Sequence, residues 1–408
     1  MKKIAFIVQR YGIEINGGAE QHCRLLAKHL ASQHDITILT SCASDYITWL
    51  PTFDAGESVV EGIKVLRFQN KEEKDKNRER YWRKILLGRF RLIRELKFKR
   101  LFFSFFKKWN DGDVWLQSQG PYCEDLITYL QNNHSQFDIL IFMTYLYYPT
   151  VVGMRVAPEK SILIPTAHNE RPIYFTPFKP FFQLPAFIMY NMNTERRFVQ
   201  KLFHNEQIPN DIAGIGIEAI SNVQKGFKQS VGIEDDFVLY VGRLDGNKGI
   251  PELLRFFTKY KKEHSNNLKL VLIGQAFMPI PSHPDIISLG FVSEEVRNSA
   301  MSEALLFVLP SRFESLSMVV LESLSFKVPV LVSGYCEVLV EHCNRSKAGF
   351  FYKKYSEFAS HIEFALNNKD ALKEMGQAGY NYVINNYNWN VIVEKFNKAF
   401  EVIDQKRM

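Results

Sequence analysis

The sequence is poor in cysteine and has no long apolar run, and each shortage excludes a class of protein. Its five cysteines are odd in number, widely scattered and without C-x-x-C spacing. A disulfide framework and a zinc site both need paired or closely spaced cysteines, so we expect reduced thiols. No stretch reaches the roughly 18 apolar residues of a membrane span, and the first residues, "MKKIAFIVQRYG", have too short an apolar core for a signal peptide. We therefore expect a cytoplasmic protein.

Internal repeats, low-complexity segments and linkers are also missing, so we expect the chain to form ordinary folded domains. Its 408 residues exceed the usual size of one hydrophobic core, and 46% hydrophobic with 23% charged residues is typical of a globular protein. No G-x-G-x-x-G follows a predicted strand, and "ILTSC" ends the second strand without the acidic residue that binds a ribose. These two absences argue against an NAD-dependent oxidoreductase.

The positive charge of the chain is concentrated in one segment. The net charge is +7, whereas residues 71–108 alone hold 15 Lys and Arg against 5 Asp and Glu. A general preference for nucleic acid is therefore not indicated. Within 81–108 the apolar residues fall on roughly one helical face, which leaves two interpretations: a helix packed on its own domain, or an interfacial helix at anionic lipid headgroups. The apolar positions are Trp82, Ile85, Leu86, Phe90, Ile93 and Leu96. Two basic residues, Arg89 and Arg100, fall on the same helical face.

The first half of the chain alternates strand and helix patterns. "KKIAFIV" is a short apolar strand, the stretch from Gly17 to Gln33 has apolar residues at helical spacing, and "DITILTSC" is a second strand. Together they predict a βαβ unit. Further continuous apolar runs, which parallel sheets bury on both faces, predict strands at 62–68, 137–144 and 161–167.

The alternation starts again in the second half of the chain. A second set of apolar runs separated by helical patterns predicts a second α/β layer system, so the fold class is α/β with two doubly wound, Rossmann-like domains. Ligands of such sheets bind beyond the carboxyl ends of the strands, so we expect one crevice that both domains share. The predicted strands are 237–243, 268–274, 286–292, 304–311 and 328–334, and the predicted helices are 249–263, 294–303 and 315–327.

The boundary between the two domains is predicted near residues 205–218. Pro209, Gly214 and Gly216 break any helical pattern there. We therefore expect one domain to end at about residue 208 and the other to begin at 209.

Two acidic residues stand in the segment "PSRFESLSMVVLESLSFKVPVLVSG". A strand ends at Pro310, a loop carries Glu314, and a helix predicted to begin near Ser315 carries Glu322. This spacing turns both carboxylates toward one side of a helix, about 12 Å apart, which suits two groups of one long ligand. Unpaired backbone N–H groups at the helix start, near Ser315 and Ser317, suit a phosphate. The spacing fits equally well with Glu314 capping the helix and Glu322 solvated.

A second polar stretch, "YVGRLDGNKGI", places two cations after a predicted buried strand. Gly242 and Gly246 allow the backbone to approach a ligand. The guanidinium of Arg243 and the ammonium of Lys248 together have the charge to neutralise a diphosphate. Taken alone, Lys-Gly after a turn also fits an ordinary solvated helix start.

The two stretches together resemble glycosyltransferase family 4, the retaining nucleotide-sugar transferases of GT-B fold. "YVGRLDGNKGI" is similar to that family's G-R…K-G segment, and "FESLSMVVLE" followed by "SFKVPVL" is similar to its E-x7-E motif. The resemblance is strongest over 237–352 and is carried by "NGGAE" within 1–42. It implies an acceptor-side domain at 1–208, a nucleotide-sugar domain at 209–387 and a final helix at 388–408 that packs back on the first domain.

The resemblance also implies roles for individual residues. Considered without it, a lone His after a strand is an ordinary hydrogen-bonded residue, and "NGGAE" is a tight turn with no ligand. Four residues are implied to be catalytic: Glu314, His168, Arg243 and Lys248. The implied positions are Arg243 and Lys248 at the donor diphosphate, Glu314 at the transferred sugar, His168 near the reacting sugar, Glu322 at the ribose, backbone amides of Ser317 and Met318 at the phosphates, Phe291 and Val292 at the base, and Gly17 and Gly18 close to a diphosphate or acceptor.

The sequence departs from the family pattern at three places. Ser317 stands where many members have Gly, Lys327 stands where a small residue or Gly is usual, and "GIGIEA" replaces the commoner Asn-Gly-Val-Asp turn. These departures put the identity of the sugar in question more than the fold.

The resemblance implies a retaining hexosyltransferase that uses a nucleoside diphosphate sugar, needs no cofactor and no metal, and serves a glycan or lipid-linked acceptor in cell-envelope polysaccharide or glycolipid biosynthesis. It would act in the cytoplasm, at the inner face of the membrane if 81–108 is interfacial. Asp111-Gly112-Asp113 has the D-x-D pattern of metal-bound diphosphates, but it does not follow a buried strand, so we expect no metal there. Two alternatives stay open: a nucleotide-sugar epimerase on the same fold, and a non-catalytic membrane-associated scaffold of a polysaccharide assembly complex.

Overall fold

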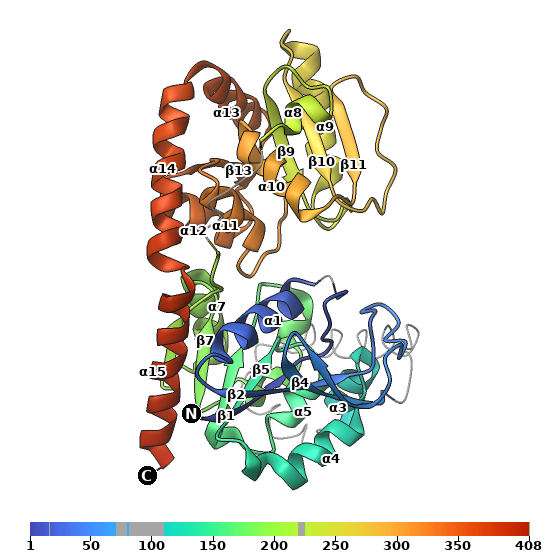
Figure 1. The fold of residues 1–408 in the computed structure, drawn as a ribbon, viewed down its shortest axis with the longest axis vertical. Helices are drawn as coiled ribbons and strands as arrows, with labels where there is room; N and C mark the ends of the chain where they lie inside the picture. Colours follow the sequence, from blue (N-terminus) through green and yellow to red (C-terminus); the bar gives the residue numbers. More distant parts are fainter. Residues whose placement is uncertain (16, 71–79, 81–109, 219–224, 408) are drawn as a thin grey trace, which may run out of the picture. The chain divides into compact units, whose positions relative to one another are not determined.

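The chain folds into two compact units, each drawn in Figure 1. The first comprises Met1–Ile215 and Ile392–Met408, and the second comprises Gly216–Val391. The computed structural model describes residues 1–15, 17–70, 80, 110–218 and 225–407. The predicted basic helix at 81–108 lies outside the described residues. The assignment of an acceptor role and a donor role to the two domains stays a prediction.

The first unit is built on an eight-stranded sheet in the order β3-β4-β2-β1-β5-β6-β7-β8. β3 is antiparallel to β4, and the other paired neighbours are parallel. Glu61 and Gly62 join β3 to β4 with positive φ at both positions, the backbone of a two-residue hairpin. The strands are β1 (Lys3–Ile7), β2 (Asp35–Ser41), β3 (Gly56–Val60), β4 (Ile63–Phe68), β5 (Ile139–Met143), β6 (Ser161–Ile164), β7 (Phe187–Tyr190) and β8 (Asn210–Ile212).

The described helices of the first unit follow the alternation that the sequence predicts. α1 buries Cys23, Leu26, Ala27 and Leu30, which recur at helical spacing. The helices are α1 (Gly18–Leu30), α3 (Asn110–Gln119), α4 (Glu124–Asn133), α5 (Tyr148–Gly153), α6 (Phe178–Phe181) and α7 (Asn193–Phe203), together with most of α15 (Trp389–Arg407).

The last helix, α15, is tied to the first unit by polar contacts. Asp404 pairs with Lys2 at 2.5 Å, and Asn397 Oδ1 lies 2.8 Å from His34 Nε2. Among the described residues, no helix is both long and apolar enough to span a membrane.

The second unit has a six-stranded, parallel sheet in the order β11-β10-β9-β12-β13-β14. The two parallel α/β layer systems predicted from the sequence are confirmed, and β9 to β13 fall within the predicted strands. The strands are β9 (Phe237–Val241), β10 (Lys269–Ile273), β11 (Ile286–Gly290), β12 (Leu306–Leu309), β13 (Val330–Ser333) and β14 (Gly349–Tyr352). The described helices are α8 (Phe227–Ser230), α9 (Ile250–Glu263), α10 (Glu294–Glu303), α11 (Met318–Ser325), α12 (Glu337–Ser346), α13 (Tyr355–Asn367) and α14 (Lys369–Asn386).

Each sheet has one point where the direction of winding reverses. In the second unit the chain runs outward from β9 to β11 on one side and from β12 to β14 on the other. In the first unit the reversal lies between β1 and β5. Loops that follow the two central strands diverge at such a point and leave a crevice beyond the carboxyl ends.

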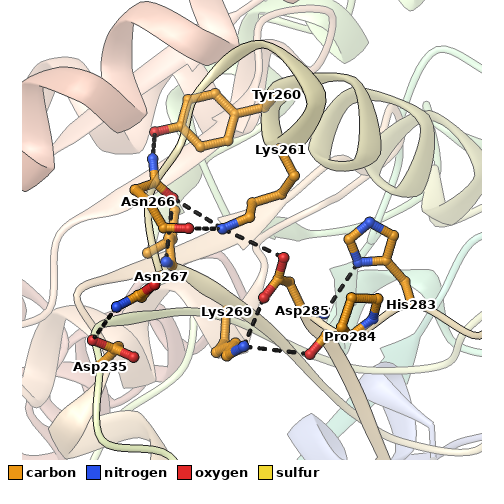
Figure 2. Close-up of polar contacts among 10 residues, drawn as sticks. Asp235, Tyr260, Lys261, Asn266, Asn267, Lys269, His283, Pro284 and Asp285 are labelled. Atoms are coloured by element: carbon orange, nitrogen blue, oxygen red, sulfur yellow. Dashed lines mark hydrogen bonds and ion pairs between the residues drawn. The ribbon is translucent and has the colours of Figure 1, made fainter.

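A polar cluster fastens the opposite, amino-terminal edge of the second sheet (Figure 2). Asp285, just before β11, accepts from Lys269 at 2.6 Å and pairs with Lys261 at 3.4 Å. Lys261 also donates to the Asn266 side chain at 3.1 Å, and Asn266 donates to the Tyr260 hydroxyl at 2.7 Å. α9 is thereby held to the loops that enter β10 and β11.

We expect the Asp285→Ala protein to lose about 2 kcal/mol of unfolding free energy, because Lys261, with only 6% of its side chain exposed, loses its carboxylate partner. Asp370→Ala is the matched control, since its partner Lys373 is 78% exposed and the loss should be much smaller than that of Asp285→Ala. Urea denaturation followed by circular dichroism measures both. Equal losses would contradict a stabilising role for the cluster.

Candidate functional site

The candidate site lies where the winding of the second sheet reverses. β9 and β12 are hydrogen-bonded neighbours there. The loop after β9 leads into α9, and the loop after β12 leads into α11. Both polar stretches singled out in the sequence therefore leave the same edge of the sheet from adjacent strands.

An ion pair joins these two loops. Lys248 Nζ donates to Glu314 Oε1 at 2.7 Å, and the side chains are 29% and 13% exposed. Gly249 has a φ of 79°, and a Cβ at this position would lie 2.5 Å from the carbonyl oxygen of Pro310. Only glycine fits both the left-handed backbone and the close approach, so Gly249 brings the two loops together.

The turn that carries Arg243 is held by its own hydrogen bonds. Asp245 Oδ1 accepts from the Lys248 N–H at 2.9 Å, and Asp245 Oδ2 lies 3.3 Å from Arg243 Nη2. The Tyr240 hydroxyl donates to the Arg243 carbonyl at 2.8 Å. The backbone is therefore fixed while the Arg243 side chain stays 40% exposed.

The helix after Glu314 begins later than predicted. α11 starts at Met318 rather than near Ser315, because Ser317 has a φ of 66° and interrupts the helical backbone. Glu314 thus lies on the preceding loop, and the distance argument based on one continuous helix was wrong. Ser317 Oγ is buried and has no hydrogen-bond partner among the residues that the structure describes. Unpaired N–H groups of the first turn, including that of Met318, follow at once.

Glu322 is mostly buried rather than solvated. It lies on α11, and its Oε2 is 3.6 Å from Arg297 Nη1 on α10. Burial raises the pKa of the Glu322 carboxyl, and the Arg297 guanidinium opposes that shift.

Phe291 and Val292 lie farther along the same edge. They follow β11, which β10 separates from β9. Phe291 is 79% exposed, so its ring is available for stacking.

Gly17 and Gly18 begin α1 in the first unit, after β1. A Cβ at Gly17 would lie 2.1 Å from Glu20 Oε2, whereas a Cβ at Gly18 would meet no atom within 4 Å. Glu20 and Arg10 form a buried ion pair at 2.5 Å. Gly17 therefore makes room for this ion pair, and the space beside Gly18 is open.

His168 follows β6 in the first unit, and its side chain is 30% exposed. Its Nε2 lies 3.5 Å from Glu170 Oε2. Glu195, at the start of α7, accepts from the backbone N–H of the adjacent Ala167 at 2.5 Å and from that of Asn191 at 2.6 Å. Burial raises the pKa of Glu195 to about 8, although these hydrogen bonds oppose the shift.

The D-x-D segment includes a carboxylate that an arginine of its own unit contacts. It lies in α3, and Asp113 accepts from Arg155 at 2.9 Å. No group of three potential metal ligands is found within the described part of the chain.

Sequence reasoning brought Lys248 and Glu314 to one place but missed their neighbours. Asp245 stands inside the quoted motif, and an Asp that precedes a helix start is a recognisable turn signal. Arg297 and, in the first unit, Glu195 carry no such signal, because Glu322 and Ala167, which they contact, are distant from them in the sequence.

Comparison with known proteins agrees with this geometry. Residues 224–382 match a family model described as glycosyl transferases group 1. An uncharacterised glycosyltransferase of Methanocaldococcus jannaschii is 32% identical over 132 residues, or 29% of this chain and 33% of that protein. Alpha-D-kanosaminyltransferase of Streptomyces kanamyceticus is 29% identical over 118 residues, or 26% of this chain and 29% of that protein. The matched segments thus span about a third of the length of these curated relatives.

Solved structures are similar over almost the whole chain. A sucrose-phosphate synthase from Thermosynechococcus elongatus has a TM-score of 0.69 at 14% identity and covers 100% of both chains. Anabaena HepE, solved with UDP and glucose, has a TM-score of 0.67 at 12% identity and covers 98% of this chain and 100% of its own. The chain has the GT-B fold. WaaG, a glycosyltransferase involved in lipopolysaccharide biosynthesis, has a TM-score of 0.62 at 13% identity and covers 98% of this chain and 99% of its own.

We expect Ser317→Gly to raise the unfolding free energy by about 1 kcal/mol, because glycine tolerates positive φ and the substitution also removes a buried, unpaired hydroxyl. Ser317→Ala removes the same hydroxyl but keeps the backbone strain, so it separates the two causes. Lys327→Gly, at another left-handed position with a φ of 62°, should gain from the backbone effect alone. Urea denaturation measures the unfolding free energy of all three variants. A Ser317→Gly protein less stable than Ser317→Ala would contradict the claim that the positive φ of Ser317 lowers stability.

Glu195 should make stability depend on pH. Its folded pKa of about 8 lies above the ordinary value of 4.5, so its contribution is complete below 4.5 and is lost as pH rises through 8. The unfolding free energy of the wild type relative to Glu195→Gln should therefore fall between about pH 5 and about pH 9. Glu206→Gln, on an exposed residue of the same unit, is the control for the general effect of replacing a carboxylate by an amide. A flat difference for Glu195→Gln would contradict the raised pKa.

Proposed function

We propose that the chain is a retaining glycosyltransferase that moves a hexose or related sugar from a nucleoside diphosphate sugar to a glycan or lipid-linked acceptor. The observation that carries the proposal is the ion pair between Lys248 and Glu314, 2.7 Å long, on two loops that meet where the sheet reverses. The family match at 224–382 contains both loops. A cation and a carboxylate side by side suit a ligand that has a phosphate next to sugar hydroxyls.

The donor is proposed to bind along the carboxyl edge of the second sheet. Arg243 and Lys248 hold the diphosphate, and the backbone N–H groups of Ser317 and Met318 complete the phosphate contacts at the start of α11. Glu314 accepts hydrogen bonds from the transferred sugar. In the same proposal Glu322 binds the ribose hydroxyls, and Phe291 and Val292 contact the base.

The proposed chemistry keeps the acceptor and the leaving group on one face of the sugar. The bond from the anomeric carbon to the phosphate oxygen breaks, and its electron pair leaves with the nucleoside diphosphate. The acceptor oxygen bonds the same carbon, and its proton passes to the leaving phosphate oxygen. Arg243, Lys248 and the helix start stabilise the negative charge that develops on that group, without a metal ion or other cofactor.

The first unit is proposed to serve the acceptor. His168, Gly17 and Gly18 follow strands of its sheet, and the space beside Gly18 is open. Because WaaG is involved in lipopolysaccharide biosynthesis, we place this chain in cell-envelope polysaccharide or glycolipid biosynthesis, in the cytoplasm at the inner face of the membrane. An epimerase, which needs no acceptor, and a scaffold without turnover are the competing functions.

Thermal unfolding with UDP, GDP, ADP and NAD tests the donor. One nucleoside diphosphate should stabilise the protein by about 2.7 kcal/mol at a concentration of about 100 times its dissociation constant. Stabilisation by NAD alone would favour a dehydrogenase instead.

Arg243→Ala should lower the rate of sugar transfer by about 100-fold, since it removes a cation from the leaving diphosphate. Arg255→Ala, on an exposed arginine of the neighbouring α9, is the matched control and should retain the wild-type rate. Release of nucleoside diphosphate in the presence of acceptor measures both. Full transfer by Arg243→Ala would exclude the proposed chemistry.

A further inference from the structure

A fully buried histidine contacts the backbone of the loop that precedes α11. His342 lies on α12 and has no exposed surface. Its Nε2 is 2.7 Å from the carbonyl oxygen of Leu316, and its Nδ1 is 3.1 Å from the Tyr382 hydroxyl. Tyr382 lies on α14, and its hydroxyl is 3.1 Å from that of Tyr387. These contacts form one chain of hydrogen bonds from Tyr387 to Leu316.

The direction of every bond in this chain follows from chemistry. Burial lowers the pKa of His342 to about 4, so the ring is neutral at physiological pH and carries one N–H. A carbonyl oxygen only accepts, so this N–H is at Nε2 and points to Leu316. Nδ1 must then accept, which makes Tyr382 the donor to it. The single hydroxyl hydrogen of Tyr382 is already donated to His342 Nδ1, so in the contact between the two tyrosines the Tyr387 hydroxyl donates to the Tyr382 oxygen.

The far end of the chain lies where the backbone enters and leaves the second unit. The Tyr387 carbonyl accepts from the Ile217 N–H at 2.6 Å, and this unit runs from Gly216 to Val391. A Cβ at Gly216 would lie 2.3 Å from the Trp389 ring, so the two crossing segments are closely packed. The hydrogen-bond chain therefore starts from a fixed point of the unit.

The near end controls a peptide group of the candidate site. In a trans peptide the C=O and the following N–H lie in one plane and point in opposite directions. The Leu316 carbonyl belongs to the same peptide as the Ser317 N–H. Fixing the carbonyl toward His342 therefore fixes the Ser317 N–H away from it, in a residue whose φ of 66° is otherwise unfavourable.

We propose that His342 is a positioning residue that, with Tyr382 holding its ring through a hydrogen bond to Nδ1, orients the Ser317 N–H toward the anionic part of the ligand. This inference rests on the proposed function only for the identity of that ligand. The hydrogen-bond chain itself is a property of the protein without ligand.

Nitrogen NMR of protein labelled with ¹⁵N-histidine tests the chain directly. At neutral pH His342 should show the Nε2–H tautomer, and the signal is assigned as the one that His342→Gln removes. In Tyr382→Phe the proton should stay on Nε2, because the Leu316 carbonyl still accepts it, but the Nδ1 chemical shift should change because Nδ1 loses its hydrogen-bond donor. An Nδ1–H tautomer in the wild type, or no change in Tyr382→Phe, would overturn the proposal.

Binding measurements test the consequence, with UDP and inorganic pyrophosphate as probes in calorimetry. His342→Leu should weaken binding of UDP by about 10-fold, whereas His342→Gln, which keeps a donor for the Leu316 carbonyl, should stay within about 3-fold of the wild type. His361→Leu is the matched control, since His361 is a half-buried histidine of α13 that donates to the Phe351 carbonyl. It should bind UDP as the wild type does.

The outcomes separate the two proposals. Wild-type protein that binds neither probe would contradict the proposed function and leave the tautomer experiment to decide the hydrogen-bond chain. Wild-type binding that His342→Leu retains in full would overturn the positioning role alone. If His342→Leu does not fold, Tyr382→Phe replaces it, with an expected loss of about 3-fold or more in UDP affinity. Unchanged affinity in that variant would contradict the proposal.

Discussion

The contact between two loops at the reversal of the second sheet is the constraint on which the candidate site depends. Gly249 lets the backbone of one loop approach Pro310 of the other, and the ion pair between Lys248 and Glu314 spans the same gap. The strands alone would bring the loops to one edge of the sheet, but not to hydrogen-bond distance. Because Gly249 allows the close approach of the two loops, Lys248 and Glu314 can form their ion pair.

Positive φ occurs at two positions where the sequence departs from the pattern of glycosyltransferase family 4, which it resembles. Ser317 and Lys327 both stand where glycine is common in glycosyltransferase family 4, and both have positive φ. The backbone is therefore left-handed at each position, and a residue with a side chain there is less favourable than glycine. At Ser317 the cost falls in the loop before α11, where the hydrogen bond from His342 to the Leu316 carbonyl holds the backbone. Strained residues persist where their surroundings over-determine them.

The sequence predicted the layers of the fold well and the details of the site less well. Strands β9 to β13 are continuous apolar runs, so their positions could be read from composition alone. β3 escaped notice because it is short and largely exposed and has only two apolar side chains, Val59 and Val60. The start of α11 was placed too early because periodicity carries no information about the φ of Ser317. Partners such as Arg297 and His342 are distant in the sequence from Glu322 and Leu316, so only the folded chain reveals them.

Each sheet has an ion pair next to the point where its winding reverses, and the two pairs differ in how far they are buried. Arg10 and Glu20 follow β1, where the first sheet reverses, and each side chain is only 7% exposed. Removing either partner would strand a buried charge, so this pair cannot exchange its partner for a ligand. Lys248, at 29% exposed, remains in contact with solvent while Glu314 holds it. An anionic ligand can therefore reach the exposed part of the ammonium while Glu314 still holds it, and this difference in exposure favours the second sheet for the proposed diphosphate site.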